Sequence, residues 1–177
     1  YEPVKKLISL GHTKIAIITG GIDHYTSQQR LNGYEKALRE CHLPIYKHYI
    51  QCGNYSTEGG YEAMMKLAKL PDPPTAVFIS NYDMEIGAYI AINNLNLKIP
   101  EDISLIGFDN LPLVNIVNPP LSFSEQPTDE MGLAAAKLLY RRMQGDQSDY
   151  PKTLIHAPIF HYTDSICSPL DKERVRL

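Results

Sequence analysis

Several features that would assign the sequence to a specialised class of protein are missing from it. It contains no Trp, and none of its apolar runs approaches the roughly 18 residues of a membrane-spanning helix. Positive charge is not in excess, because 17 Lys and Arg stand against 20 Asp and Glu and give a formal net charge of −3. Free-standing nucleic-acid-binding domains are usually basic. These absences disfavour a membrane protein and a domain that binds DNA without a further domain.

The sequence also lacks the residue spacings that metal sites, cofactor sites and covalent catalysis require. Its three cysteines, Cys41, Cys52 and Cys167, form no Cys-x-x-Cys pair, and its six histidines form no His-Glu-x-x-His motif. There is no Gly-x-Ser-x-Gly elbow, and the two glycines at 20–21 belong to neither a dinucleotide-binding motif nor a P-loop. We therefore predict no catalytic residue, no metal and no cofactor. The odd number of cysteines favours a reducing, cytoplasmic setting.

The beginning of the chain carries neither a secretion signal nor an initiator Met. Residues 1–4, Tyr-Glu-Pro-Val, lack the basic and apolar regions of a signal peptide. We expect the chain to begin inside a longer one or to follow a processing step. Its 177 residues, 44% of them hydrophobic, are enough to bury one sizeable core.

Short apolar runs alternate with segments of helical periodicity through the first two thirds of the chain. The pattern predicts strands at 15–19, 45–51, 76–79 and 103–106, and helices near 27–41, 61–68 and 82–95. Thr26 and Gln29 form a capping-box pattern at the start of the first of these helices. The alternation is typical of an α/β fold with a three-layer α/β/α arrangement and a mostly parallel sheet. Uniformly apolar strands indicate that both faces of the sheet are covered.

The last third of the sequence is less regular. Residues 109–121 hold three prolines and no clear period, which predicts a long loop. A helix is predicted over 127–144, closing strands near Ile155 and over 159–162, and a charged, poorly ordered tail at the end.

Polar side chains follow the predicted strands at the point where each strand ends. Ligands of open α/β sheets bind beyond the carboxyl ends of the strands, and Arg30, Asn81 and Asp109 all fall there. Tyr55, which precedes the second of the predicted helices, could offer a ring face to a ligand. Each residue also has a structural explanation: a surface Arg, a helix cap, a turn Asp and a packed aromatic. Together they suit a polyhydroxylated ligand better than a reaction.

The helix over 82–95 is apolar on two sides. Met84, Ala88, Ile92 and Leu95 form a stripe that we expect in the core. A second stripe consists of Ile86, Tyr89 and Ile90, and we expect it to be a subunit interface. The alternative is a helix that is deeply buried inside one domain.

Five segments in register resemble one family, the LacI/GalR-type transcriptional repressors. They are LGHTKIAII at 10–18, RLNGY at 30–34, PTAVFISN at 74–81, PEDISLIGFD at 100–109, and PPL at 119–121 followed by Gln126-Pro127. The resemblance implies a periplasmic-binding-protein-like type I effector domain, in which two α/β subdomains hold an effector, usually a sugar. It also implies a homodimer and a helix-turn-helix head that binds operator DNA.

The resemblance carries over to individual positions of this sequence. Arg30, Asn81 and Asp109 match effector contacts of the family, Tyr55 matches an aromatic wall, and Thr26 and Gln126 match less constant contact positions. The sequence departs from the family where Tyr82 follows Asn81 and where Glu85 replaces the usual Ala. We expect Asp83 to take over capping there, and Glu85 to bear on ligand geometry and on the dimer contact.

The resemblance also implies a division of the chain. Residues 1–121 and 146–166 correspond to the second, C-terminal effector-binding subdomain, and 167–177 to a tail. Residues 122–145 correspond to a strand and a helix that cross to the N-terminal subdomain, which is absent along with the head. That helix would then expose Met131, Ala135 and Leu138, so we expect it to be disordered, displaced or packed on a neighbouring chain.

The sequence thus predicts the effector-binding and dimerisation part of a LacI/GalR-type regulator, and no enzyme. The expected partners are a small-molecule effector, most simply a sugar, a second copy of the chain, and operator DNA through the missing head only. No membrane partner is expected. A sugar-binding component of a transport system with the same fold is one alternative, and it would need an upstream signal peptide. A small α/β hydrolase is another, and it would need a nucleophile–base pair, which the sequence does not offer.

Overall fold

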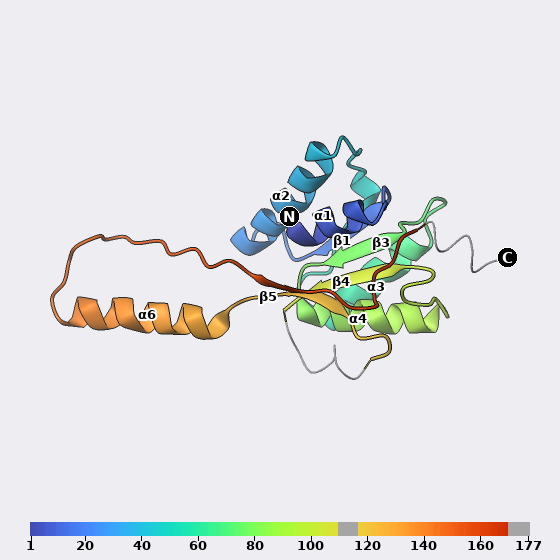
Figure 1. Cartoon of the computed structure of the whole chain (residues 1–177). Coiled ribbons are helices and arrows are strands. Elements are labelled where there is room, and N and C mark those ends of the chain that lie inside the picture. The colour runs from blue at the N-terminus through green and yellow to red at the C-terminus, as the bar shows by residue number, and fades with distance from the viewer. Residues whose placement is uncertain (110–116, 170–177) are drawn as a thin grey trace.

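A computed structural model describes residues 1–109 and 117–169 of the chain (Figure 1). The expectations for the middle of the 109–121 loop and for the charged end of the tail fall on residues 110–116 and 170–177, outside the described residues.

A six-stranded sheet forms the centre of the molecule. Its strands are β1 (Ile15–Thr19), β2 (Ile50–Cys52), β3 (Ala76–Ile79), β4 (Ser104–Phe108), β5 (Ser122–Glu125) and β6 (Ile159–His161), in the order β2-β1-β3-β4-β5-β6. All neighbouring pairs are parallel except β5 and β6. One row across the sheet pairs Ile17 with Phe78 and Phe78 with Ile106. The predicted mostly parallel sheet is therefore confirmed.

Helices cover both faces of this sheet. Helices α1 (Glu2–Ser9) and α2 (Tyr25–Glu40) lie on one face, and α3 (Thr57–Ala68) and α4 (Tyr82–Asn94) lie on the other (Figure 1). Alternate residues of β1 face opposite layers, because successive side chains of a strand point to opposite sides. Ile15 and Ile17 join the core under α1 and α2, whereas Ala16 and Ile18 join the core under α3 and α4. These two cores confirm the three-layer arrangement.

The ends of several elements differ from the predicted ones. Helix α2 begins at Tyr25 with His24 as its N-cap, so the prediction that Thr26 caps it is wrong. Helix α3 begins one turn earlier than expected, where the Ser56 hydroxyl accepts a hydrogen bond from the Gly59 amide at 3.0 Å. A short 3₁₀ turn precedes β2, which is shorter than predicted. Ile155 is in no strand and is 93% exposed.

His12 is structural, as its position after Gly11 predicts. Helix α1 ends just before Gly11, which adopts a φ of +97° that an L side chain would rarely accept. The buried His12 ring contacts the Thr75 Oγ1 through Nδ1 and the Cys167 carbonyl through Nε2, both at 2.8 Å. These bonds join α1, the entry to β3 and the last described residues of the chain.

The strand β5 belongs to this sheet and not to a crossing segment, so the predicted boundary at residue 122 is wrong. It pairs with β4, and Ser122, Phe123 and Ser124 are buried. Two of its residues are buried serines, Ser122 and Ser124, which the family resemblance had placed in the crossing segment. Hydrogen bonds satisfy one of them, because Ser165 accepts from the Ser122 amide at 2.8 Å and the Ser122 hydroxyl accepts from the Thr163 amide at 2.9 Å.

The segment that leaves the body is residues 126–158, which we call the arm. It consists of α6 (Thr128–Met143) and an extended return that runs back beside the helix to β6 (Figure 1). A polar contact joins the two, with 3.7 Å between His156 Nδ1 and Glu130 Oε2. Residues 146–158 are therefore part of the arm and not of the compact subdomain to which the sequence assigned them.

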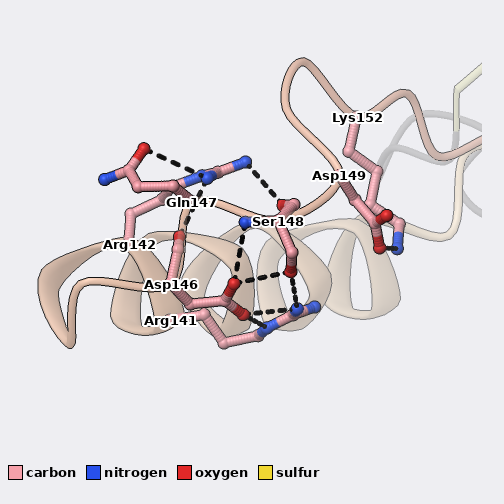
Figure 2. A network of polar contacts seen from close by, with 7 residues as sticks. All are labelled: Arg141, Arg142, Asp146, Gln147, Ser148, Asp149 and Lys152. Atoms are coloured by element: carbon pink, nitrogen blue, oxygen red, sulfur yellow. Dashed lines mark hydrogen bonds and ion pairs between the residues drawn. The ribbon is translucent and has the colours of Figure 1, made fainter.

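A polar network closes the tip of the arm (Figure 2). One oxygen of Asp146 accepts a hydrogen bond from the Ser148 amide at 2.9 Å, and the other accepts one from Arg141 Nε at 2.8 Å. Arg142 donates to the carbonyl oxygens of Asp146 and Ser148. The bonds from Ser148 and Arg141 hold the pKa of the Asp146 carboxyl well below its usual value. The turn after α6 is therefore well defined although it lies far from the body.

Helix α6 is regular but none of its residues is buried. Met131, Leu133, Leu139 and Met143 are 41%, 57%, 63% and 76% exposed. Ala135 is exposed as predicted, while Leu138 is half-buried. The helix is displaced from the body and is not disordered. Its packing on a neighbouring chain stays a prediction.

Candidate ligand-binding site

The predicted site residues gather at the carboxyl edge of the sheet. Asn81 is the second residue after β3, Asp109 directly follows β4, and Arg30 lies in the second turn of α2, the helix that follows β1. Backbone bonds align the strand ends, from the Ser80 amide to the Ile18 carbonyl at 3.0 Å and from the Asp109 amide to the Ser124 carbonyl at 2.8 Å. The loops that carry these residues therefore share one rim.

Arg30 is built into this rim and is not a free surface residue. Its guanidinium lies 3.7 Å from the centre of the Phe108 ring, and its Nη1 donates to the carbonyl oxygen of Ser80. Burial lowers the pKa of Arg30, and the Asp109 carboxylate partly offsets this. A guanidinium carries five N–H donors, so the bond to Ser80 leaves donors that can meet a ligand oxygen.

Asp109 and Gln126 contact each other directly. The Gln126 side chain donates from Nε2 to Oδ1 of Asp109 at 2.7 Å. Asp109 adopts a φ of +84°, a conformation uncommon for a residue with a side chain. Gln126 directly follows β5, and β5 was not predicted as part of this sheet. The strand-end rule would therefore have found Gln126 if β5 had been recognised.

Tyr55 connects the starts of α2 and α3. Its hydroxyl lies 3.0 Å from Thr26 Oγ1 and 2.5 Å from Ser27 Oγ. The ring covers Gly20, where a Cβ atom would come within 2.2 Å of it, so only glycine fits below this tyrosine. Tyr55 and Thr26 are thus brought together at the rim, and the aromatic ring is held over the loop that follows β1.

Asn81 caps α4. Its Oδ1 accepts hydrogen bonds from the amides of Asp83 at 3.1 Å and Met84 at 3.4 Å. The prediction that Asp83 takes over this role is therefore wrong. Because the helix uses the amide oxygen, a ligand would meet the NH₂ group of Asn81.

The second apolar stripe of α4 lies on the outer side of the helix. Ile86 and Tyr89 are half-buried, and Ile90 is 42% exposed. Deep burial of this side, the alternative to an interface, is not seen in the described part of the chain. The stripe remains open to a second copy.

Glu85, one of the positions at which the sequence departs from the family, lies beneath the site. Its side chain is fully buried and faces Gly107, where a Cβ atom would come within 2.2 Å of its Oε1. Burial, and to a smaller extent the nearby Asp109, raises the pKa of Glu85 to about 8. The sequence had suggested that Glu85 bears on the dimer contact. Its side chain is buried inside the fold, so it is not on a surface that a second copy could contact. The feature of the sequence that could have pointed to its burial is an acidic residue next to the apolar positions of α4.

The described residues form no group of three metal-binding side chains. Within the same part of the chain, no helix is long and apolar enough to cross a membrane.

Comparison with known proteins identifies the class to which this fold and rim belong. The model of the periplasmic binding protein-like domain matches residues 4–162, so the chain belongs to that family. Its fold is the one predicted from the sequence.

The relatives and solved structures narrow this class to one group of regulators. The ribose operon repressor of Haemophilus influenzae is 37% identical over 95% of this chain and 50% of the relative. A putative LacI transcriptional regulator from Bacillus cereus superposes with a TM-score of 0.89 at 31% identity, over 94% of this chain and 59% of that chain. A sugar-binding LacI-family regulator from Escherichia coli, complexed with phosphate, gives 0.85 at 32% identity over 95% and 60%.

These likenesses confirm the resemblance to LacI-type transcriptional repressors. The chain spans about half the length of the curated relatives that it matches.

Proposed function

We propose that the chain is the effector-binding and dimerisation part of a LacI-type repressor, and that its effector is a sugar. The observation that carries this is the shared rim of Arg30, Asp109 and Gln126. A guanidinium, a carboxylate and an amide there offer donors and acceptors to adjacent hydroxyl groups, beside the ring of Tyr55. The names of the relatives support the choice of a sugar, because one is a ribose operon repressor and one structure is of a sugar-binding regulator.

The Asp109–Gln126 bond suggests how the effector acts. Gln126 is the first residue of the arm, so a ligand that contacts Asp109 also bears on the point where the arm leaves the sheet. A change of arm angle would move whatever packs on α6, which we propose is the other subdomain. A ligand that favours one angle then shifts the balance between DNA-binding and non-binding states.

The remaining partners follow from this role. A second copy of the chain would pack on the stripe of Ile86, Tyr89 and Ile90, and operator DNA would bind through a head outside this chain. The protein would act in the cytoplasm and catalyse no reaction.

A two-stage experiment on the longer protein tests this function. A thermal-shift panel that includes D-ribose, cellobiose and inorganic phosphate identifies the compounds that bind, because a ligand of the native state raises the melting temperature. Fluorescence anisotropy of labelled operator DNA then shows whether the same compound releases the DNA or tightens its binding. We expect one sugar to raise the melting temperature and also to change the affinity of the protein for operator DNA. If the panel yields phosphate alone, or if no sugar that binds alters operator affinity, the proposal is wrong.

A further inference from the structure

A buried carboxyl group, that of Glu85, lies beneath the proposed effector site. Both oxygens of Glu85 are buried and have no hydrogen-bond partner among the described residues. Buried polar groups in native proteins are nearly always paired, and an exception calls for an explanation. The exception here lies next to ligand-binding residues and not in an unrelated part of the core.

The position of Glu85 ties it to two of these residues at once. It lies one helical turn after Asn81, to whose carbonyl its own amide donates at 3.1 Å. Its carboxyl group packs over Gly107, which is two residues before Asp109 in the chain. Glu85 therefore lies next to the backbone that carries Asn81 and Asp109, on the side of the sheet that α4 covers.

The surroundings of Glu85 favour its neutral form. The only charged group that acts on it from the described residues is Asp109, which has the same sign. The segment 110–116 contains no Asp, Glu, Lys, Arg, His, Tyr or Cys, so its sequence supplies no titratable group either. A carboxylate without a partner is costly to bury, and burial raises the pKa of Glu85 to about 8.

We propose that Glu85 is a positioning residue of the effector site, whose proton keeps Asp109 bonded to Gln126. In its neutral form it fills the space over Gly107 without repelling the Asp109 carboxylate. When it loses its proton, the new negative charge lies close enough to the Asp109 carboxylate to repel it. The Asp109–Gln126 bond is then broken and the polar rim loses its arrangement. The effect on sugar binding rests on the proposed function, whereas the effect on Asp109 does not.

Carboxyl ¹³C NMR on this chain tests the proposal without any sugar. Glu85 and Asp109 signals are assigned with Glu85→Gln and Asp109→Asn, and are followed between about pH 6 and pH 9.5. In the unmodified chain we expect the Asp109 signal to shift with the midpoint of Glu85, near pH 8. In Glu85→Gln the Asp109 signal should stay constant, because the amide resembles the neutral acid and cannot ionise. Glu62→Gln, the same change at an exposed residue of α3, should behave like the unmodified chain.

Two results would overturn the proposal. One is an Asp109 signal that does not respond while Glu85 titrates. The other is the same Asp109 shift in Glu85→Gln as in the unmodified chain. If Glu85→Gln does not fold, as judged by circular dichroism, Glu85→Ala takes its place and the same two results decide.

Binding of D-ribose to the longer protein separates the proposal from the proposed function. Each pH unit above the Glu85 midpoint should weaken binding about tenfold in the unmodified protein and leave Glu85→Gln unchanged. Equal pH dependence in both proteins would refute the positioning role. If D-ribose does not bind at any pH, the NMR result alone decides on Glu85, and the failure counts against ribose as the effector.

Discussion

The body of the molecule and the arm use similar apolar residues with opposite results. In the body, strands such as β1 and β3 are completely buried between two layers of helices. In the arm, α6 carries Met, Leu and Ala in a helical pattern and buries none of them. The body is therefore stabilised by its own packing, whereas α6 depends on local bonds such as the network at its tip (Figure 2). The difference is the one expected if α6 packs on the other subdomain, as proposed above.

Removing a buried side chain from the body should produce the largest effect on stability. Leu105 on β4 is fully buried, so Leu105→Ala should lower the free energy of unfolding by about 2–5 kcal/mol. The matched change in the arm, Leu139→Ala, removes a side chain that is 63% exposed and should change it by less than about 0.5 kcal/mol. Urea unfolding followed by circular dichroism measures both. A similar loss in the two variants would mean that the arm packs on the body in solution.

The pH dependence of stability should also separate the two regions. The pKa of Glu85 is raised from its ordinary value to about 8, so its proton stabilises the native state fully below about pH 4.5, and this contribution is lost as the pH rises to about 8. At about 1.4 kcal/mol per pKa unit, the loss amounts to a few kcal/mol. Glu85→Gln should remove this slope in urea titrations at several pH values.

The arm offers a matched carboxyl group with the opposite shift. The pKa of Asp146 is lowered, so its contribution is present above its ordinary pKa and is lost only on acidification. Asp146→Asn should therefore leave the slope between about pH 5 and pH 8 as it is in the unmodified chain. A changed slope in this variant would show that the tip of the arm and the body titrate together.

Two histidines allow a smaller comparison of the same kind. His12→Ala leaves the half-buried Thr75 hydroxyl and Cys167 carbonyl without the ring that contacts them, which should reduce stability by about 1–3 kcal/mol. His156→Ala in the arm removes only a 3.7 Å contact with the exposed Glu130 and should cost less than about 0.5 kcal/mol. Thermal unfolding of the two variants at neutral pH measures the difference. Equal shifts of the melting temperature would contradict the structural role of His12.

A modest effect on stability should come from the residue at the junction of the two regions. Gln126→Ala removes one hydrogen bond to Asp109 and should lower stability by about 0.5–1.5 kcal/mol. Its effect on geometry should be larger, because this bond fixes the start of the arm. Spin labels on the exposed residues Glu62 and Lys137 report the distance between body and arm. We expect a broader distance distribution in the variant, and an unchanged distribution would show that Gln126 does not orient the arm.

The fold was predictable where burial on both faces leaves a continuous apolar run. The strands β1, β3 and β4 were found in this way, and the rule on strand ends then found Arg30, Asn81 and Asp109. The strand β5 has no such run, because Ser122 and Ser124 flank Phe123, and Ser122 depends on hydrogen bonds with residues about 40 positions further on. Glu85 could not be placed, because its environment arises only when α4 packs over Gly107. Side chains that depend on distant partners leave no local pattern.

Release of operator DNA by the longer protein tests the central claim most directly, namely that the rim at the strand ends binds the effector. The measurement is anisotropy of labelled operator during titration with the sugar that the thermal panel selects, for the unmodified protein, for Asp109→Ala and for Glu62→Ala as control. We predict equal operator affinity without sugar in all three proteins, and loss of the sugar response in Asp109→Ala alone. A full sugar response in Asp109→Ala at the same sugar concentrations would contradict the account.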